Sequence, residues 1–316
     1  MHNQRYIRGL WLIALALFGC TSEPTERRPD ETVMHFPDSM ALFNKTLAIA
    51  STSADREYSF GRLVTINTDS IKQAINDKEK KKPINWSKVV ASNVLIPLEI
   101  GELSLTKNYL TFASRDNGQL IALPMSDGLA KCNGKDMEAA SCPGAKSLML
   151  PSEDPYAITK LPSAENEELV VVSYLSSDRI DVVKIGSGAT LPMNIVKSFH
   201  SKDDWINKKF PSAKLKNQRI ITRKTQVSFK DDAARSHVYF LLEQHPKKTN
   251  APVKAKAAYL ATVKIRDLLG EDLPASKVEV LNLKELFAIS GVQDFYVMRK
   301  ALSCMCLRAY RRRSLR

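Results

Sequence analysis

The chain has 316 residues, of which 44% are hydrophobic and 26% charged, and a formal net charge of +13. This composition is ordinary for a globular protein, and the length allows one large or two ordinary domains. The positive charge does not indicate a nucleic-acid partner, because seven basic residues and no acidic ones lie in residues 299–316 alone. The other basic residues occur in mixed-sign runs, without the interleaved aromatic residues of a nucleic-acid surface.

Residues 1–19 have the pattern of a secretory signal peptide. Arg5 and Arg8 make the start basic, and residues 9–19 are apolar or glycine. As a helix with a rise of about 1.5 Å per residue, this run would span roughly 16 Å, about half of a ~30 Å hydrocarbon core. It is too short for a stable transmembrane helix and has the length of the hydrophobic region of a secretory signal.

The apolar run ends in Leu17-Phe18-Gly19-Cys20. This tetrapeptide resembles the lipobox of bacterial lipoproteins, although Phe18 is bulkier than the residue usual at its position. The resemblance implies cleavage before Cys20 and covalent attachment of diacylglycerol and a fatty acyl group such as palmitate. Two or three acyl chains make a durable anchor, whereas one binds a membrane only marginally. No other cofactor is expected, and the alternative is an ordinary cleaved signal or a free cysteine.

Residues 20–40 are polar and proline-bearing, which predicts a flexible tether after the lipidated cysteine. Thr21 follows Cys20 in place of the aspartate that retains many Gram-negative lipoproteins in the inner membrane. The resemblance therefore implies a lipid-anchored protein of the bacterial cell envelope, at the outer membrane.

Four segments of the body resemble one another, each with an apolar β-rich run, a polar turn and a second, alternating apolar run: 46–70, 109–128, 169–188 and 238–267. This pattern predicts a β-hairpin in each. Asp55, Asp116 and Asp178 recur in the first three turns about every 60 residues, a period typical of repeat architectures. We expect these aspartates to cap the hairpins on the outside of the domain. Asn117-Gly118 favours a tight turn, because both positions tolerate positive φ.

The repeats predict an all-β domain over residues 41–298, a β-propeller with four-stranded blades that is incomplete in this chain. One such blade cannot bury both of its faces, so neighbouring blades must stack around an axis. Residues 155–185 resemble the repeat of YVTN-type bacterial propellers. Residues 114–118, Ser-Arg-Asp-Asn-Gly, resemble the turn of Asp-box propellers, with Ile121 where that motif has Trp. A β-sandwich is the alternative.

Helical content is predicted to be minor. The run from Thr68 places Ile71, Ala74 and Ile75 on one face of a short helix, and residues 277–290 predict a strand followed by a helical turn.

Cys132 and Cys142 bracket a short loop between Asn-Gly and Pro-Gly pairs, which predicts a surface disulfide. Closing so small a loop contributes about 2–3 kcal/mol in an oxidising compartment. A metal site is the weaker interpretation, because no histidine or second CxxC lies nearby.

Residues 299–316 change in composition, with six Arg to one Lys and no acidic residue. We interpret this atypical basic tail as the out-of-frame end of a truncated gene. The alternative is a tail that binds anionic lipid, at about 1 kcal/mol per charge.

No catalytic, cofactor-binding or metal-ligating residue is predicted, because HExxH, GxSxG, Walker A and GxGxxG are absent from the sequence. We interpret His200, His237 and His245 as structural, and Asp203-Asp204 as turn or loop residues. Three functions remain. We expect a membrane-anchored propeller scaffold that binds an envelope protein or glycan. The alternatives are a propeller hydrolase or quinoprotein-like enzyme, which needs a central ring of acidic and basic groups, and an outer-membrane assembly lipoprotein, which needs an exposed apolar or strand-pairing surface.

Overall fold

A computed structural model gives the structure of the protein. It describes residues 37–52, 58–76, 89–106, 108–126, 129–130, 132, 137–163, 168–186, 192–211, 215, 218–228, 236–246 and 257–283, and the backbone of 292–297 and 305–309. The predicted signal peptide, Cys20 and Asp55 lie outside these residues.

Four antiparallel sheets, each with four principal strands, follow one another along the chain and are called blades 1 to 4. Blade 1 consists of β1 (Pro37–Phe43), β2 (Thr46–Ser51), β3 (Gly61–Asn67) and β4 (Val90–Ile96). Blade 2 consists of β5 (Ile100–Leu105), β6 (Tyr109–Ser114), β7 (Gln119–Ser126) and β9 (Lys146–Met149), with β8 (Leu129–Ala130) paired to the end of β7.

Blade 3 consists of β10 (Pro155–Leu161), β11 (Glu168–Tyr174), β12 (Arg179–Ile185) and β13 (Met193–His200). Blade 4 consists of β14 (Gln218–Val227), β15 (His237–Pro246), β16 (Ala257–Lys264) and β17 (Val278–Asn282). A further antiparallel pair follows, β18 (Val292–Val297) and β19 (Met305–Ala309). The four predicted hairpins are confirmed as β2–β3, β6–β7, β11–β12 and β15–β16.

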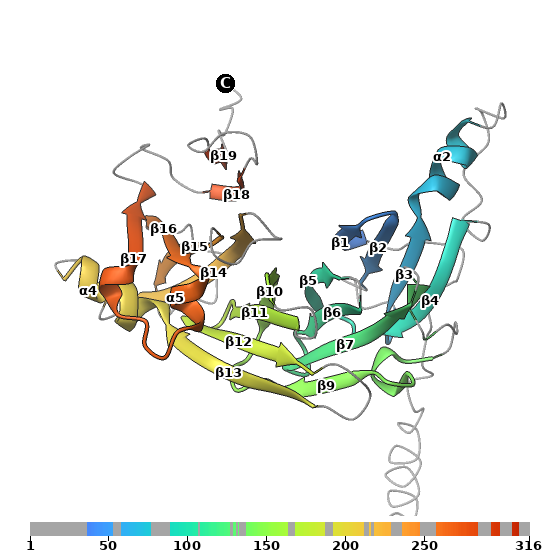
Figure 1. Cartoon of the computed structure of the whole chain (residues 1–316), viewed down its shortest axis with the longest axis horizontal. Helices are drawn as coiled ribbons and strands as arrows, with labels where there is room; N and C mark the ends of the chain where they lie inside the picture. Colours follow the sequence, from blue (N-terminus) through green and yellow to red (C-terminus); the bar gives the residue numbers. More distant parts are fainter. Residues whose placement is uncertain are drawn as a thin grey trace, which may run out of the picture.

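The blades lie side by side in an arc (Figure 1). The first strand of each blade lines the inside of the arc, and β4, β9, β13 and β17 lie on the outside. Contacts run from β1 to β5, from β5 to β10, from β10 to β14 and from β14 to β18. This radial order confirms a β-propeller-like fold and differs from the two facing layers of a β-sandwich.

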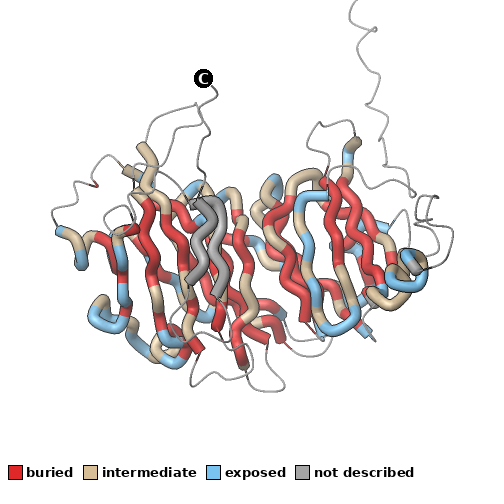
Figure 2. The backbone as a smooth tube through the Cα atoms, turned by 90° about the horizontal axis from the view of Figure 1, so that it is seen from above, coloured by how far each residue is buried: buried red, intermediate tan, exposed pale blue. Residues whose placement is uncertain are grey.

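The middle strands of the blades are covered on both faces (Figure 2). Every residue of β6 and of β11 is buried, so their sequences, YLTFAS and ELVVVSY, read as nearly continuous apolar runs without the polar alternation of a half-exposed strand. Separate apolar clusters join blade 1 to blade 2, blade 2 to blade 3 and blade 3 to blade 4. The core of the protein is therefore a series of interfaces between sheets.

Two predicted boundaries differ from the structure. β1 begins at Pro37, inside the segment predicted as tether, because residues 39–43 pair with β2. β19 lies inside the atypical basic tail, paired with β18. The described strands thus extend beyond residues 41–298 at both ends.

The predicted helix is confirmed as α2 (Thr68–Asn76). Ile71 and Ala74 pack on the apolar surface of blade 1, whereas Ile75 is exposed. The strand predicted in residues 277–290 is β17, and the helical turn predicted after it lies outside the described residues. None of the helices in the described ranges is long and apolar enough to cross a membrane.

Cys132 and Cys142 are joined in a disulfide with their Cα atoms 5.3 Å apart, the pairing expected from the sequence. The expected surface position is wrong, because both cysteines are buried in the cluster between blades 1 and 2. The backbone explains this position. The Leu95 N–H of β4 donates to the Met137 carbonyl at 2.9 Å, and this bond holds the bridged loop against the core.

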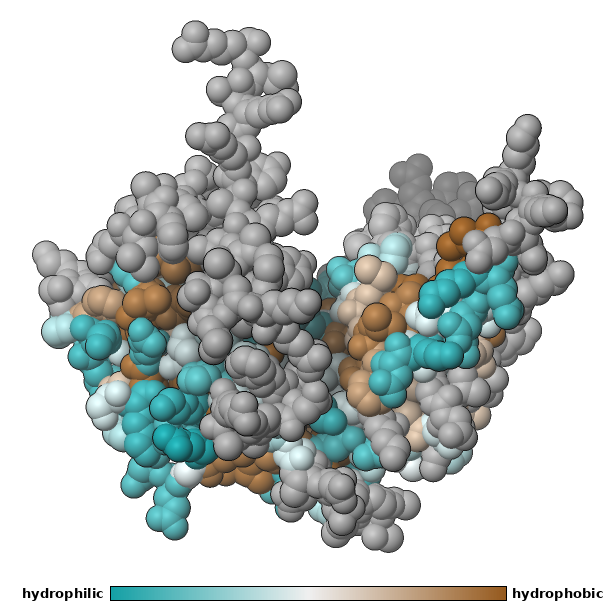
Figure 3. Space-filling model, turned by 45° about the horizontal axis from the view of Figure 1, so that its top comes forward, coloured by the Kyte–Doolittle hydropathy of each residue, from teal (hydrophilic) through white to brown (hydrophobic). Residues whose placement is uncertain are grey.

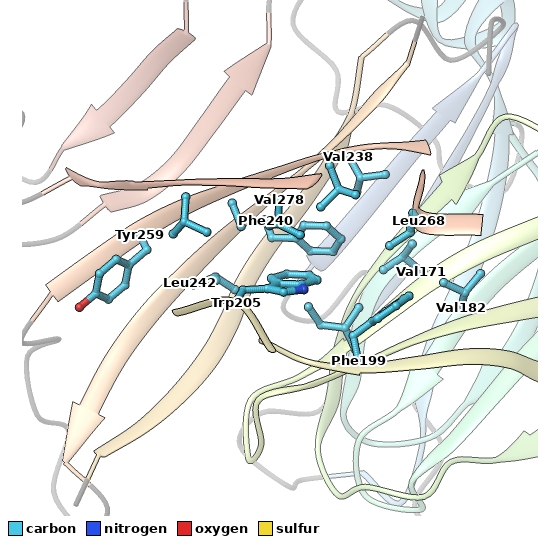
Figure 4. Packing of buried hydrophobic residues seen from close by; sticks show 14 of the residues in the cluster. Val171, Val182, Phe199, Trp205, Val238, Phe240, Leu242, Tyr259, Leu268 and Val278 are labelled. Carbon is cyan, nitrogen blue, oxygen red and sulfur yellow. The ribbon is translucent and has the colours of Figure 1, made fainter. Parts of the chain in front are cut away.

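Trp205 lies between Phe199 of blade 3 and Phe240 of blade 4 (Figure 4). The residues predicted as turn or loop around Asp203-Asp204 instead form η2 (Ser201–Ile206), a π-helical turn that continues into α4 (Asn207–Lys209). Trp205 of η2 is 1% exposed, and its ring lies 5.1 Å from the ring of Phe240 and 6.3 Å from that of Phe199. One aromatic side chain thus links two blades.

We expect Trp205→Ala to lower the free energy of unfolding by about 3–5 kcal/mol, because it leaves a cavity between two blades. Trp205→Phe should lower it by less. It keeps an aromatic ring in the wedge and removes an indole N–H that is buried without a hydrogen-bond partner in the described structure. Urea unfolding followed by circular dichroism measures both variants, and equal losses would contradict this packing role.

Candidate functional site

The first strands of the four blades line an axial cavity of about 730 Å³. It is lined by residues 38–43 of β1, 101–105 of β5, 156 and 158–160 of β10, and 223–227 of β14. Each blade therefore contributes one strand, and residues from distant parts of the sequence meet there.

Contacts between the first strands hold the wall of the axial cavity together. The Leu103 N–H donates to Ser39 Oγ at 2.9 Å, joining β5 to β1. Thr159 Oγ1 donates to the Thr225 carbonyl at 3.0 Å, joining β10 to β14. Between β5 and β10 the backbones approach so closely that a Cβ on Gly101 would lie 2.2 Å from the Tyr156 carbonyl oxygen. Only glycine permits this approach.

The cavity wall carries charges of both signs. Glu102 Oε1 lies 2.9 Å from Lys224 Nζ in an ion pair that joins β5 to β14 past the intervening β10. A partly exposed pair of this kind contributes little to stability, about 0–1 kcal/mol. Its effect is to neutralise one acidic and one basic group of the wall. Asp38, Lys160 and the exposed Arg223 are the other charged residues that line the cavity.

Two guanidinium groups flank the ring of Tyr156. Arg223 and Arg115 each lie 5.7 Å from the ring centroid. Arg115, in the β6–β7 turn, donates from Nε to Asp154 Oδ1 at 2.6 Å and lies 3.7 Å from Glu99. Burial alone would lower the pKa of Arg115, but the bond to Asp154 and the charges of Asp154 and Glu99 raise it. Arg115 therefore stays charged, and we call this group, Tyr156 with Arg115 and Arg223, the Tyr156 site.

The Tyr156 site offers two kinds of contact to a ligand. An aromatic ring packs against apolar ligand surface, and a guanidinium binds a carboxylate through two parallel hydrogen bonds. Arg223 is the exposed member and lines the cavity, whereas Arg115 is held by acidic neighbours. Hydroxyl groups of Ser39, Ser104 and Thr159 belong to residues of the same wall.

The two described repeat aspartates lie in hairpin turns, away from the residues that line the cavity. Asp116 Oδ2 accepts the Glu99 N–H at 3.1 Å, and Asp178 Oδ2 accepts the Lys202 N–H at 3.1 Å. In each case the aspartate ties its turn to a neighbouring segment of the same blade. These are structural contacts between each turn and the segment beside it.

Two histidines have carboxylate neighbours that the sequence search missed. His245 Nε2 lies 3.1 Å from Glu243 Oε2, and His200 Nδ1 lies 3.4 Å from Asp178 Oδ1. The sequence could have predicted the first pair, because His245 and Glu243 are two residues apart and such residues lie on the same face of a strand. The second depends on the pairing of β12 with β13. Within the described ranges, no three His, Cys, Asp or Glu residues form a group that could hold a metal ion.

The sequence matches no protein-family model and no curated protein. Similar solved structures include the Nup133 β-propeller domain of Vanderwaltozyma polyspora, with a TM-score of 0.42, 9% identity and coverage of 78% of this chain and 58% of that one. The computationally designed Ika8 protein has a TM-score of 0.35 and 9% identity, covering 77% and 59%. BamB from Moraxella catarrhalis has a TM-score of 0.32 and 10% identity, covering 74% and 62%.

The chain thus spans less than two thirds of the length of each of these three structures. Its assignment as a β-propeller-like protein rests on its own four blades and the axial cavity that their first strands line.

We expect Gly101→Ala to lower the free energy of unfolding by about 1–3 kcal/mol, because the added methyl forces β5 and β10 apart. Gly270→Ala is the matched control, since its new methyl would make ordinary contacts of 3.4 Å and its φ is −62°. Urea unfolding compares the two variants. A loss in Gly101→Ala no larger than in Gly270→Ala would show that the close approach of the inner strands is not a constraint.

Proposed function

We propose that the protein is a lipid-anchored binding protein of the bacterial cell envelope that holds a polar, acid-bearing ligand at the Tyr156 site. The observation that carries this proposal is the exposed guanidinium of Arg223, 5.7 Å from the Tyr156 ring centroid, in the wall of the axial cavity. The cavity volume of about 730 Å³ falls in the range of about 300–1,000 Å³ typical of ligand sites.

An acidic glycan fits this chemistry best. Its carboxylate can pair with Arg223, the less polar face of a sugar ring can pack on Tyr156, and its hydroxyl groups can bond to the wall. A partner protein that presents a carboxylate at the same place is the alternative occupant. An enzyme is supported less well, because Glu102 is paired with Lys224 at 2.9 Å while Asp116 and Asp178 serve hairpin turns.

Anchoring is proposed from the sequence of the N-terminus. Cys20 follows the short apolar run in a lipobox-like tetrapeptide, and the segment from Cys20 to the start of β1 at Pro37 would separate the propeller from the membrane. Such an anchor would hold the whole domain, with its axial cavity, in the envelope, where glycans and other envelope proteins are present.

Arg223→Ala should weaken binding of polygalacturonate about tenfold to a hundredfold, because a hydrogen bond to a charged group contributes about 1.5–3 kcal/mol. Arg219→Ala is the control: Arg219 is exposed on the same strand but does not line the cavity. Isothermal titration calorimetry with polygalacturonate, and with dextran as a neutral polysaccharide, measures the effect. Equal binding by both variants, or equal binding of dextran, would rule out the Tyr156 site as an acidic-glycan site.

The anchor is tested by intact mass spectrometry of membrane-fraction protein expressed in a bacterium. We expect the mass of the chain from Cys20 plus diacylglyceryl and acyl groups, and loss of the lipid in Cys20→Ala. An unprocessed chain, or a soluble product without lipid, would contradict the proposed anchoring. That outcome would not bear on the proposed glycan site, which the binding experiment tests independently.

A further inference from the structure

The first strand of every blade carries an irregularity that the middle strands lack. Where a first strand pairs with the second, the register shifts by one residue: at 37–39 in β1, 100–103 in β5, 155–158 in β10 and 222–224 in β14. The pairs of second and third strands show no such shift. A bulge of this kind adds a residue to one strand and redirects a side chain. It recurs once in each blade and is therefore a property of the repeat.

The shifted segments place one functional side chain from each blade in the wall of the axial cavity. These side chains are Asp38 of β1, Glu102 of β5, Tyr156 of β10 and Arg223 of β14. The Tyr156 site depends on two of them, because the Arg223 guanidinium lies 5.7 Å from the Tyr156 ring centroid. The same irregularity thus supplies different chemistry from each of the four blades.

The charged residues of the cavity wall are sorted by sign. The acidic ones, Asp38 and Glu102, belong to β1 and β5, and the basic ones, Lys160, Arg223 and Lys224, belong to β10 and β14. Glu102 and Lys224 neutralise each other in their 2.9 Å ion pair. Asp38 is exposed on one side of the cavity, and Arg223 is exposed on the other. The axial cavity therefore has an acidic side and a basic side.

Blade 1 presents few polar groups to a ligand in the axial cavity. Of the β1 residues that line it, Asp38 and Ser39 are polar, and Ser39 Oγ already accepts the Leu103 N–H. Figure 3 shows hydrophobic residues gathered on the right-hand lobe, on the side toward the gap between the two lobes. An ionised carboxylate only accepts hydrogen bonds, and it binds most strongly to a charged donor such as an ammonium group. Asp38 is therefore suited to a cationic part of a ligand.

We propose that the axial cavity binds a zwitterionic glycan, which carries ammonium as well as carboxylate groups, with a carboxylate at Arg223 and an ammonium at Asp38. This inference rests on the proposed function, because it adds a second contact to the carboxylate site of Arg223. Contacts run from β1 to β5, from β5 to β10 and from β10 to β14, so two strands lie between Asp38 and Arg223. An oligosaccharide fits this separation better than a single sugar.

The test compares two ligands that differ only in their amino groups. One is an oligosaccharide of hyaluronan, whose amines are acetylated, and the other is the same oligosaccharide after N-deacetylation. Isothermal titration calorimetry at mildly acidic pH, where the free amines are protonated, measures both. We expect the chain to bind the N-deacetylated form about threefold to tenfold more tightly, as for a partly exposed hydrogen bond between charged groups. The formal net charge of +13 by itself favours hyaluronan, so this preference requires a local acidic group.

Asp38→Asn should abolish the preference and leave hyaluronan binding unchanged, because the amide keeps the shape of the side chain and removes its charge. Asp272→Asn is the matched control, since Asp272 is exposed and removes the same charge but does not line the cavity. Arg223→Ala should weaken binding of both ligands. Urea unfolding checks that Asp38→Asn is folded, which is expected for an isosteric change at an exposed position.

Equal binding of the two ligands by the unmodified chain would overturn the proposal. A preference that survives in Asp38→Asn, or one that is lost equally in Asp272→Asn, would also overturn it. Hyaluronan binding that Arg223→Ala weakens would in each case leave the proposed function standing without the contact to Asp38. Binding of neither ligand would overturn this proposal as well, and the polygalacturonate titration would then decide the proposed function.

Discussion

A four-stranded sheet with two apolar faces must bury both, and in this protein it can do so only against other sheets of the same kind. All residues of β6 and of β11 are buried, so neither blade 2 nor blade 3 has a face suited to solvent. Stacking the blades satisfies this requirement and forces the first strands toward a common centre. The arc and the axial cavity both follow from this one constraint.

The first strands give the axial cavity a wall that combines charged and hydroxyl side chains with apolar ones such as Met40 and Leu42. They approach one another so closely that glycine is required at position 101, beside Tyr156. Glu102 of β5 forms an ion pair with Lys224 of β14, past the intervening strand β10. The Tyr156 site lies where β10 and β14 bring an aromatic ring and a guanidinium together. The candidate site therefore lies where the inner strands of the blades converge.

Much of the local structure could be predicted. The four hairpins carry alternating or continuous apolar runs around turn residues, and α2 carries a helical spacing of Ile71 and Ala74. The pairing of Cys132 with Cys142 followed from a short loop, but their burial did not, because it depends on where that loop docks. The Tyr156 site was not predicted, since Arg115, Tyr156 and Arg223 are far apart in the sequence and each is unremarkable alone.

The sequence by itself determined the repeat, the strand order within each blade and the turns, because these depend on periodicity and on residues close together in the chain. Only the tertiary structure decided which residues meet at the axis, where Trp205 wedges between blades, and that Met40 and Leu42 remain exposed. Those features depend on how far each blade is rotated from the last. That rotation is set by the volumes of side chains packed between whole sheets, a quantity that no single segment of the sequence contains.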